Sequence, residues 1–144
     1  MSERSTNDLY RDTVLKHNRK PHGYDGDHEV THQASLHNQV CGDHVTVRLL
    51  VEHEQVLAAS FCGESCAICT ASASILCQSA VGRSVSALVA GHRDLERALG
   101  SNGDQVLDWP DANGLVGVRK FPSRVRCALL PWEASTKALL EASL

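Results

Sequence analysis

The sequence lacks three features that would place it in a membrane, an export pathway or a complex with nucleic acid. No apolar run approaches the roughly 20 residues that a membrane-spanning helix needs. Residues 1–7 hold no hydrophobic segment of the kind found in secretory signals. There is no run of lysine and arginine, and the formal net charge is −3, which disfavours nucleic acid as a main partner. We therefore expect a cytoplasmic protein that binds neither membrane nor nucleic acid.

Internal repeats and low-complexity tracts are also absent, so a chain of 144 residues predicts one domain with one hydrophobic core. Apolar residues make up 42% and charged residues 22%, a balance typical of folded rather than disordered chains. The six cysteines are the unusual part of the composition. In a reducing compartment, where structural disulfides are rare, cysteines more often bind metal or react. The simpler alternative is that some of them are small buried hydrophobic residues.

Hydrophobic periodicity predicts an α+β protein with an N-terminal helix, a small antiparallel sheet and then several packed helices. Residues 1–6 form a polar tail, and a helix is expected at about 7–18. The polar, histidine-rich segment 22–43 alternates weakly at Val30, Ala34 and Leu36, which is a weak indication of a strand. Clear alternation predicts an antiparallel hairpin of two strands, at 44–52 and 55–62.

Small residues dominate the segment beyond the hairpin, which predicts a helix that packs closely against its neighbours. It should end near Gly82, and Ser84 should cap a second helix that runs to Leu99. The Gly-, Asp- and Asn-rich residues 100–117 are expected to form a surface loop. A last helix is expected at about 123–142, with Pro131 kinking it or starting it afresh.

Three short cysteine-bearing stretches carry most of the chemical information. Each places a thiol beside turn-prone or basic residues, and the first adds a carboxylate. Three thiolates and one carboxylate complete a tetrahedral zinc shell, or most of the shell of an iron–sulfur cluster. Each stretch alone is equally compatible with a buried structural cysteine. The stretches are Cys41-Gly42-Asp43, Gly63-Glu64-Ser65-Cys66-Ala67 and Arg124-Val125-Arg126-Cys127.

The other three cysteines, Cys62, Cys69 and Cys77, fit a metal site less well. Cys69 follows Cys66 by about one helical turn and could share an ion with it. Cys77 would lie about 16 Å further along the same helix, too far for a mononuclear site. Core packing is therefore the better interpretation for all three, with Cys62 and Cys69 as possible auxiliary thiols.

Residues 28–32 match the H-E-x-x-H pattern of zinc metallopeptidases, in which two histidines on one helical face bind the ion. The surrounding residues alternate as in an extended chain and show no strong apolar stripe. On a strand, His28 and His32 would stand about 13 Å apart and could not share one ion. A peptidase is thus the remote alternative, with Glu29 as its general base.

Several stretches, taken together and in order, resemble the NifU/IscU-like iron–sulfur assembly proteins. The resemblance covers nearly the whole chain, so it implies one such domain over residues 1–144 with the SufE/NifU-like fold. The SufU type is the most similar, because residues 100–117 match its insertion loop and Arg126 stands where IscU-type scaffolds carry a histidine. The stretches are Leu9-Tyr10-Arg11, Cys41-Gly42-Asp43, Gly63-Glu64-Ser65-Cys66-Ala67-Ile68, Ala71-Ser72-Ala73-Ser74 and Phe121-Pro122-Ser123-Arg124-Val125-Arg126-Cys127.

The resemblance implies that Cys41, Asp43, Cys66 and Cys127 bind one zinc ion. It also implies a pyridoxal-phosphate-dependent cysteine desulfurase of the SufS type as partner, with further iron–sulfur assembly machinery downstream. A desulfurase side chain would displace Cys41 from zinc, and the freed thiolate would take the sulfane sulfur of the persulfide. Arg124 matches a supporting arginine that orients Asp43 or the partner. The implied function is a zinc-dependent sulfur acceptor in iron–sulfur biogenesis.

The nearest alternative is a scaffold that assembles and transfers [2Fe–2S] clusters, with a cluster or iron in place of zinc. The chain also departs from the family pattern, because Ser65 replaces the usual glycine before Cys66 and would stiffen that corner. Cys62 and Cys69 stand where other small or polar residues are expected. Fewer sequence features therefore support the set of four ligands than support the family resemblance.

Overall fold

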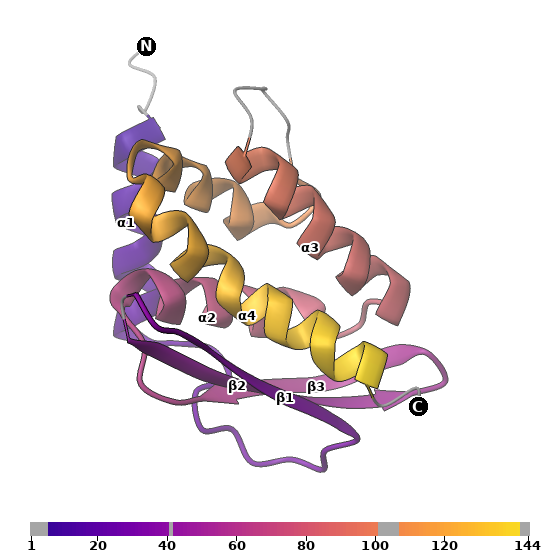
Figure 1. Cartoon of the computed structure of the whole chain (residues 1–144). Helices are drawn as coiled ribbons and strands as arrows, with labels where there is room; N and C mark the ends of the chain where they lie inside the picture. Colours follow the sequence, from indigo (N-terminus) through magenta and orange to yellow (C-terminus); the bar gives the residue numbers. More distant parts are fainter. Residues whose placement is uncertain (1–5, 41, 101–106, 142–144) are drawn as a thin grey trace.

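The computed structural model describes residues 6–40, 42–100 and 107–141, and it has the expected α+β architecture (Figure 1). Two helices, α2 and α4, lie against a three-stranded antiparallel sheet of order β1-β2-β3. The strands are β1 (His32–Asn38), β2 (Asp43–Glu52) and β3 (Gln55–Cys62). The helices are α1 (Thr6–Arg19), α2 (Ala67–Ala80), α3 (Val85–Gly100), η1 (Pro110–Lys120) and α4 (Pro122–Glu141).

Inward- and outward-facing side chains alternate along β2, and one of the inward-facing residues is polar. Val45, Val47 and Leu49 are fully buried on the helix-covered face, and each contributes about 1.5–3 kcal/mol of hydrophobic stabilisation. Asp43 belongs to the same odd-numbered series and is only 1% exposed. The strand therefore directs the Asp43 carboxylate to the inside of the molecule.

Helix α2 packs closely against α4 because most of its residues are small. Its Ser72 hydroxyl donates a hydrogen bond to the Ala128 carbonyl of α4. The same oxygen accepts a hydrogen bond of 3.0 Å from the Trp132 indole nitrogen. Ser72 and Trp132 are fully buried, so this polar link fixes α2 against α4 inside the core.

One expectation was confirmed and another was wrong. The weakly alternating segment 22–43 does contain a strand, the edge strand β1, which pairs with β2 from His32↔Leu49 to Asn38↔Asp43. Much of the expected surface loop is the 3-10 helix η1, in which Leu115 and Val118 are fully buried. Trp109, just before η1, packs edge-on against Trp132 with ring centroids 5.0 Å apart. Residues 101–106 of the expected insertion lie outside the described residues, and the insertion itself stays a prediction.

Helix α4 does not restart at Pro131, although a restart was one of two expected outcomes; the other, a kink, stays a prediction. The helix is one continuous element of 20 residues, because the single backbone hydrogen bond that proline removes is outweighed by the burial of Leu130, Pro131 and Trp132. Across the described ranges, no helix is both long enough and apolar enough to span a bilayer.

A buried hydrogen-bonded chain of serine, histidine and aspartate joins α1, α2 and η1. His17 Nε2 donates to Asp111 Oδ2 at 2.7 Å, and His17 Nδ1 lies 2.7 Å from the Ser74 hydroxyl. Ser74 is fully buried, and its oxygen also accepts the backbone N–H of His22. A substrate has no access to this hydroxyl, so the chain serves the fold and not catalysis.

This network predicts a pH-dependent loss of stability. Burial alone would raise the pKa of Asp111, but hydrogen bonds from His17 and Lys16 outweigh burial and hold the pKa below its ordinary 3.8. A depressed carboxyl pKa stabilises the fold above about pH 4, and that contribution is lost as pH falls through the folded-state value. Asp111→Asn should therefore unfold at lower urea concentration than the wild type at pH 7.

The difference between Asp111→Asn and the wild type should shrink as the pH is lowered below about 4. Asp108→Asn is the matched control, because the Asp108 side chain is 99% exposed and forms a long ion pair of 3.7 Å with Arg83. Equal urea midpoints for the wild type and Asp111→Asn at pH 7 would show that the network does not stabilise the fold.

Candidate metal centre

Three of the four expected ligands converge on one point inside the molecule. Asp43 begins β2, Cys66 precedes the first turn of α2, and Cys127 lies in the second turn of α4. One carboxylate oxygen of Asp43 and the two sulfur atoms lie within 4.8 Å of one another. Asp43 and Cys127 are buried and Cys66 is partly exposed, so Cys66 is the one of these three described residues that reaches the surface.

Hydrogen bonds to Cys66 hold the Asp43 carboxylate in place. Its Oδ1 accepts the Cys66 backbone N–H at 2.6 Å, and its Oδ2 lies 3.5 Å from the Cys66 sulfur. Cys66 is the N-cap of α2, where its sulfur accepts the Cys69 backbone N–H at 3.4 Å. These bonds fix the positions of Cys66 and Asp43 relative to the first turn of α2.

The loop before Cys66 is fixed by a glycine that no other residue can replace without strain. Gly63 has φ +120°, and a Cβ on it would overlap the backbone carbonyl oxygen of His44. The backbone carbonyl of the next residue, Glu64, accepts a hydrogen bond of 2.7 Å from the backbone N–H of His44. The close approach of Gly63 and the Glu64 hydrogen bond therefore hold this loop against β2, and Cys66 is placed opposite Asp43.

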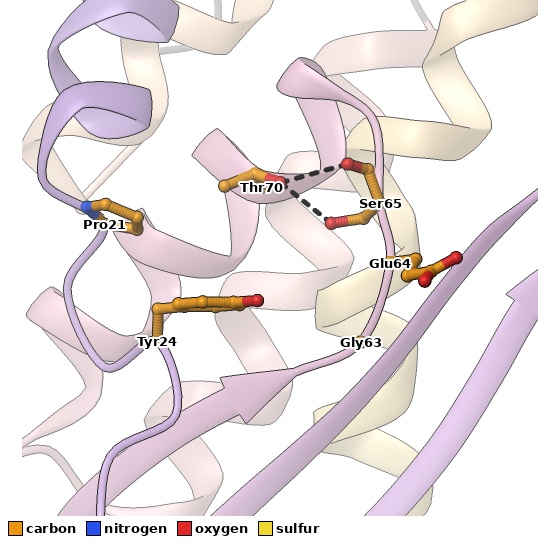
Figure 2. Close-up of a pocket in the computed structure, with 6 residues that line it drawn as sticks. All are labelled: Pro21, Tyr24, Gly63, Glu64, Ser65 and Thr70. Carbon is orange, nitrogen blue, oxygen red and sulfur yellow. Dashed lines mark hydrogen bonds between the residues drawn. The ribbon is translucent and has the colours of Figure 1, made fainter.

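Ser65, which departs from the family pattern, is accommodated by a local hydrogen bond. Its hydroxyl lies 2.8 Å from the Thr70 hydroxyl, and Thr70 also donates to the Ser65 carbonyl (Figure 2). Figure 2 shows these residues with Gly63 and Glu64 along one side of a surface pocket of about 400 Å³, and Pro21 and Tyr24 along the other. The pocket flanks the Cys66 loop but contains none of the three ligand residues.

The donor set fits a zinc ion better than a hard cation. Two sulfur atoms and one carboxylate oxygen are three of the four donors of a tetrahedral zinc site, and magnesium or calcium would prefer oxygen alone. An ion would also neutralise the Asp43 carboxylate, which is otherwise buried beside two thiols. Cys41, the expected fourth ligand, lies outside the described residues.

One further residue adjoins the cluster, and it was not predicted as part of the site. Burial raises the pKa of the Tyr10 phenol, as do the nearby sulfurs of Cys66 and Cys127, while Arg124 opposes this shift. Tyr10 therefore lies near the two thiols and near Arg124, whose side chain is exposed. Tyr10 was visible in the sequence only as part of the family pattern.

The remaining described cysteines stay outside the cluster. Cys69 and Cys77 are buried in the hydrophobic core, as expected, and burial raises the pKa of the Cys77 thiol. Cys62 is half-buried at the end of β3. All five cysteines in the described ranges are free of disulfides.

The H-E-x-x-H stretch does not form a metallopeptidase helix. His28 and Glu29 lie in an irregular segment and His32 begins β1, so the stretch is not helical and only its last residue belongs to a strand. His28 Nε2 contacts the Ser60 hydroxyl at 2.8 Å, and His32 Nδ1 contacts the Thr31 hydroxyl at 2.7 Å. The two rings are engaged separately, and neither belongs to a candidate metal cluster of the described residues.

The sequence matches one protein family and is similar to proteins of known name. The model of the NifU-like N-terminal domain family matches residues 9–128. The chain is 30% identical to an iron–sulfur cluster assembly scaffold protein IscU of Streptococcus pyogenes, over 92% of this chain and 84% of that protein. It is 31% identical to the zinc-dependent sulfurtransferase SufU of Bacillus subtilis, over 91% of this chain and 89% of that protein.

A solved structure shares the fold. The crystal structure of the N-terminal part of a NifU-like protein from Brucella abortus matches with a TM-score of 0.86 at 23% identity. The match covers 96% of this chain and 98% of that one. At this identity the likeness concerns the fold alone.

Proposed function

This chain belongs to the family of NifU-like N-terminal domains, and from that premise we propose that it is a zinc-dependent sulfur acceptor in iron–sulfur cluster biogenesis. Its proposed partner is a pyridoxal-phosphate-dependent cysteine desulfurase of the SufS type, and further assembly machinery follows. The convergence of Asp43, Cys66 and Cys127 on one point carries the proposal. The five cysteines of the described ranges form no disulfide, which suits a reducing compartment, and we place the protein in the cytoplasm.

In the proposed site, Cys41 joins the three clustered residues as fourth ligand. Cys41 is two residues before Asp43 in the sequence, and Gly42 between them has φ +76°, which allows a tight turn. Bound zinc would supply positive charge that keeps the cysteines deprotonated and protects them from oxidation. The carboxylate of Asp43 is the hard donor of the set and the one least matched to a soft site.

The proposed transfer is a thiolate exchange at Cys41. The Cys41 thiolate attacks the terminal sulfur of the persulfide on the desulfurase, and a new S–S bond forms at Cys41. The original S–S bond breaks, so the desulfurase cysteine leaves as a thiolate and no external oxidant or reductant is consumed. Asp43, Cys66 and Cys127 remain in place, and we assign to Arg124, an exposed residue near Tyr10, the supporting role of orienting the incoming partner or Asp43.

A [2Fe–2S] scaffold is the second candidate, because the relative from Streptococcus pyogenes is named an iron–sulfur cluster assembly scaffold protein. Arg126 argues for sulfur transfer. It occupies the position before Cys127 at which IscU-type scaffolds carry a histidine, and its guanidinium pairs with Glu133. Its side chain is 57% exposed and has no lone pair for a metal, so it supplies no ligand to a cluster.

The test is to give the protein, purified without oxygen, to a SufS-type desulfurase with cysteine as substrate. We expect one zinc per chain, no visible chromophore, and one added sulfur atom at Cys41 by mass spectrometry. Cys41→Ala should abolish that added sulfur while leaving part of the zinc bound.

Cys62→Ala is the matched control, because Cys62 is half-buried and lies outside the cluster. It should accept sulfur as the wild type does. Brown, iron-loaded protein would support the scaffold instead, and undiminished sulfur acceptance by Cys41→Ala would refute the role of Cys41.

A further inference from the structure

A second group of metal-binding side chains lies between α3 and α4. His92 and Glu96 are one turn apart on α3, and Glu133 lies on α4. One ring nitrogen and one carboxylate oxygen from each glutamate lie within 4.8 Å of one another. Glu133 is six residues beyond Cys127, about 9 Å along the helix, so this group is separate from the thiol cluster.

His92 is held in an orientation that leaves one nitrogen unused. Its Nδ1 lies 2.8 Å from the Thr136 hydroxyl on α4. Its Nε2 is the one buried side-chain nitrogen or oxygen atom without a hydrogen-bond partner in the part of the chain that the structure describes. A buried unpaired nitrogen costs free energy, and a cation would satisfy it.

The Thr136 contact is compatible with the tautomer that binds metal through Nε2. When Nδ1–H donates to the Thr136 hydroxyl, Nε2 presents its lone pair, which is the usual arrangement of a metal-ligating histidine with an outer hydrogen-bond partner. Burial lowers the pKa of His92, an effect that Glu96 and Glu133 oppose, so the neutral ring is favoured at pH 7.

The two glutamates supply negative charge that the described residues compensate only in part. Glu133 pairs with Arg126 through Oε1, which leaves Oε2 for another partner. Glu96 is exposed and makes no ion pair with any described residue. Carboxylates and a histidine at helical spacing on facing helices are the way in which bundle proteins build metal sites.

We propose that His92, Glu96 and Glu133 bind one divalent transition-metal ion, with Thr136 as the residue that positions His92. A donor set of one imidazole nitrogen and two carboxylate oxygens suits Mn²⁺, Fe²⁺ or Zn²⁺. The thiol cluster selects softer ions, so the two sites differ in the metals that they prefer. This inference does not depend on the sulfur-acceptor function.

Mn²⁺ is the probe of choice, because it avoids thiolate ligands and should not displace zinc from the first site. Zinc-loaded full-length protein is titrated with Mn²⁺, and the free ion is followed by electron paramagnetic resonance. We expect one Mn²⁺ per chain, with paramagnetic broadening of NMR signals centred on His92, Glu96 and Thr136. Glu96→Gln should weaken binding by about tenfold or more.

Thr136→Val should weaken Mn²⁺ binding by about ten- to a hundredfold, because it removes only the outer partner of His92. Thr136→Ser should restore the wild-type affinity. Glu141→Gln is the matched control, since Glu141 is an exposed acid on the same helix outside the group.

Thermal melting of each metal-free variant verifies that it folds. Three results would overturn the proposal: no Mn²⁺ bound to the wild type, broadening scattered over exposed acidic residues, or equal affinity in Glu96→Gln and the wild type. Unchanged affinity in Thr136→Val would remove the positioning role.

Discussion

Cys127→Ala should lower the affinity of the protein for zinc by at least about a hundredfold, or about 2.8 kcal/mol. Cys127 is fully buried on α4, and its sulfur lies within 4.8 Å of the Cys66 sulfur and an Asp43 oxygen. Its removal leaves the proposed site with two thiolates and one carboxylate. Zinc affinity is measured by competition with a chromophoric chelator at a fixed pH, since ligand deprotonation makes it pH-dependent.

The matched control is Cys77→Ala, which deletes a buried thiol outside the cluster. Without zinc, both variants should lose a similar, small amount of stability, because each loses one buried sulfur atom from the core. With zinc, only the wild type and Cys77→Ala should gain thermal stability. If Cys127→Ala gained as much as the wild type, Cys127 would not be a ligand.

Gly63→Ala should destabilise the fold by about 3 kcal/mol and weaken zinc binding at the same time. Gly63 has φ +120°, and an added Cβ would overlap the His44 carbonyl oxygen, which belongs to the backbone of β2 and cannot rotate away. The loop must move off β2, which carries Cys66 away from Asp43. Urea unfolding gives the stability and the chelator competition gives the affinity.

Gly82→Ala is the control for Gly63→Ala, because it introduces the strain of a positive φ without a steric overlap of the added Cβ. Gly82 also has a positive φ, +91°, but no atom lies within 4 Å of an added Cβ. This substitution should lower the free energy of unfolding by about 1 kcal/mol and leave zinc binding unchanged. Equal stability losses in the two variants would show that contact with His44 does not fix the Cys66 loop.

The parts of the fold that follow from local pattern were predictable from the sequence. Strict alternation predicted the β2–β3 hairpin, and the Ser84 hydroxyl caps α3 by accepting the Ala87 N–H, as expected. The same alternation, extended to Asp43, predicts that its carboxylate points inward. The resemblance to the family supplied the ligand set, because no local pattern relates positions so far apart.

The parts that depend on tertiary partners were not predictable. The residues of η1 look like a loop because apolar ones are sparse, yet Leu115 and Val118 are buried there, and Trp132 of α4 packs against the preceding Trp109. Likewise, the i, i+4 spacing of His92 and Glu96 is visible in the sequence, but Glu133 joins them only through the packing of α3 on α4.

The placement of the three clustered ligands on a strand, a helix start and a distant helix has a consequence for the order of folding. Asp43 and Cys66 are separated by 23 positions, and Cys127 lies much further along the chain. No short peptide segment can assemble this site, so α4 must dock before all three donors meet. We therefore expect metal capture to be a late event in folding, limited by a long chain closure rather than by diffusion of the ion.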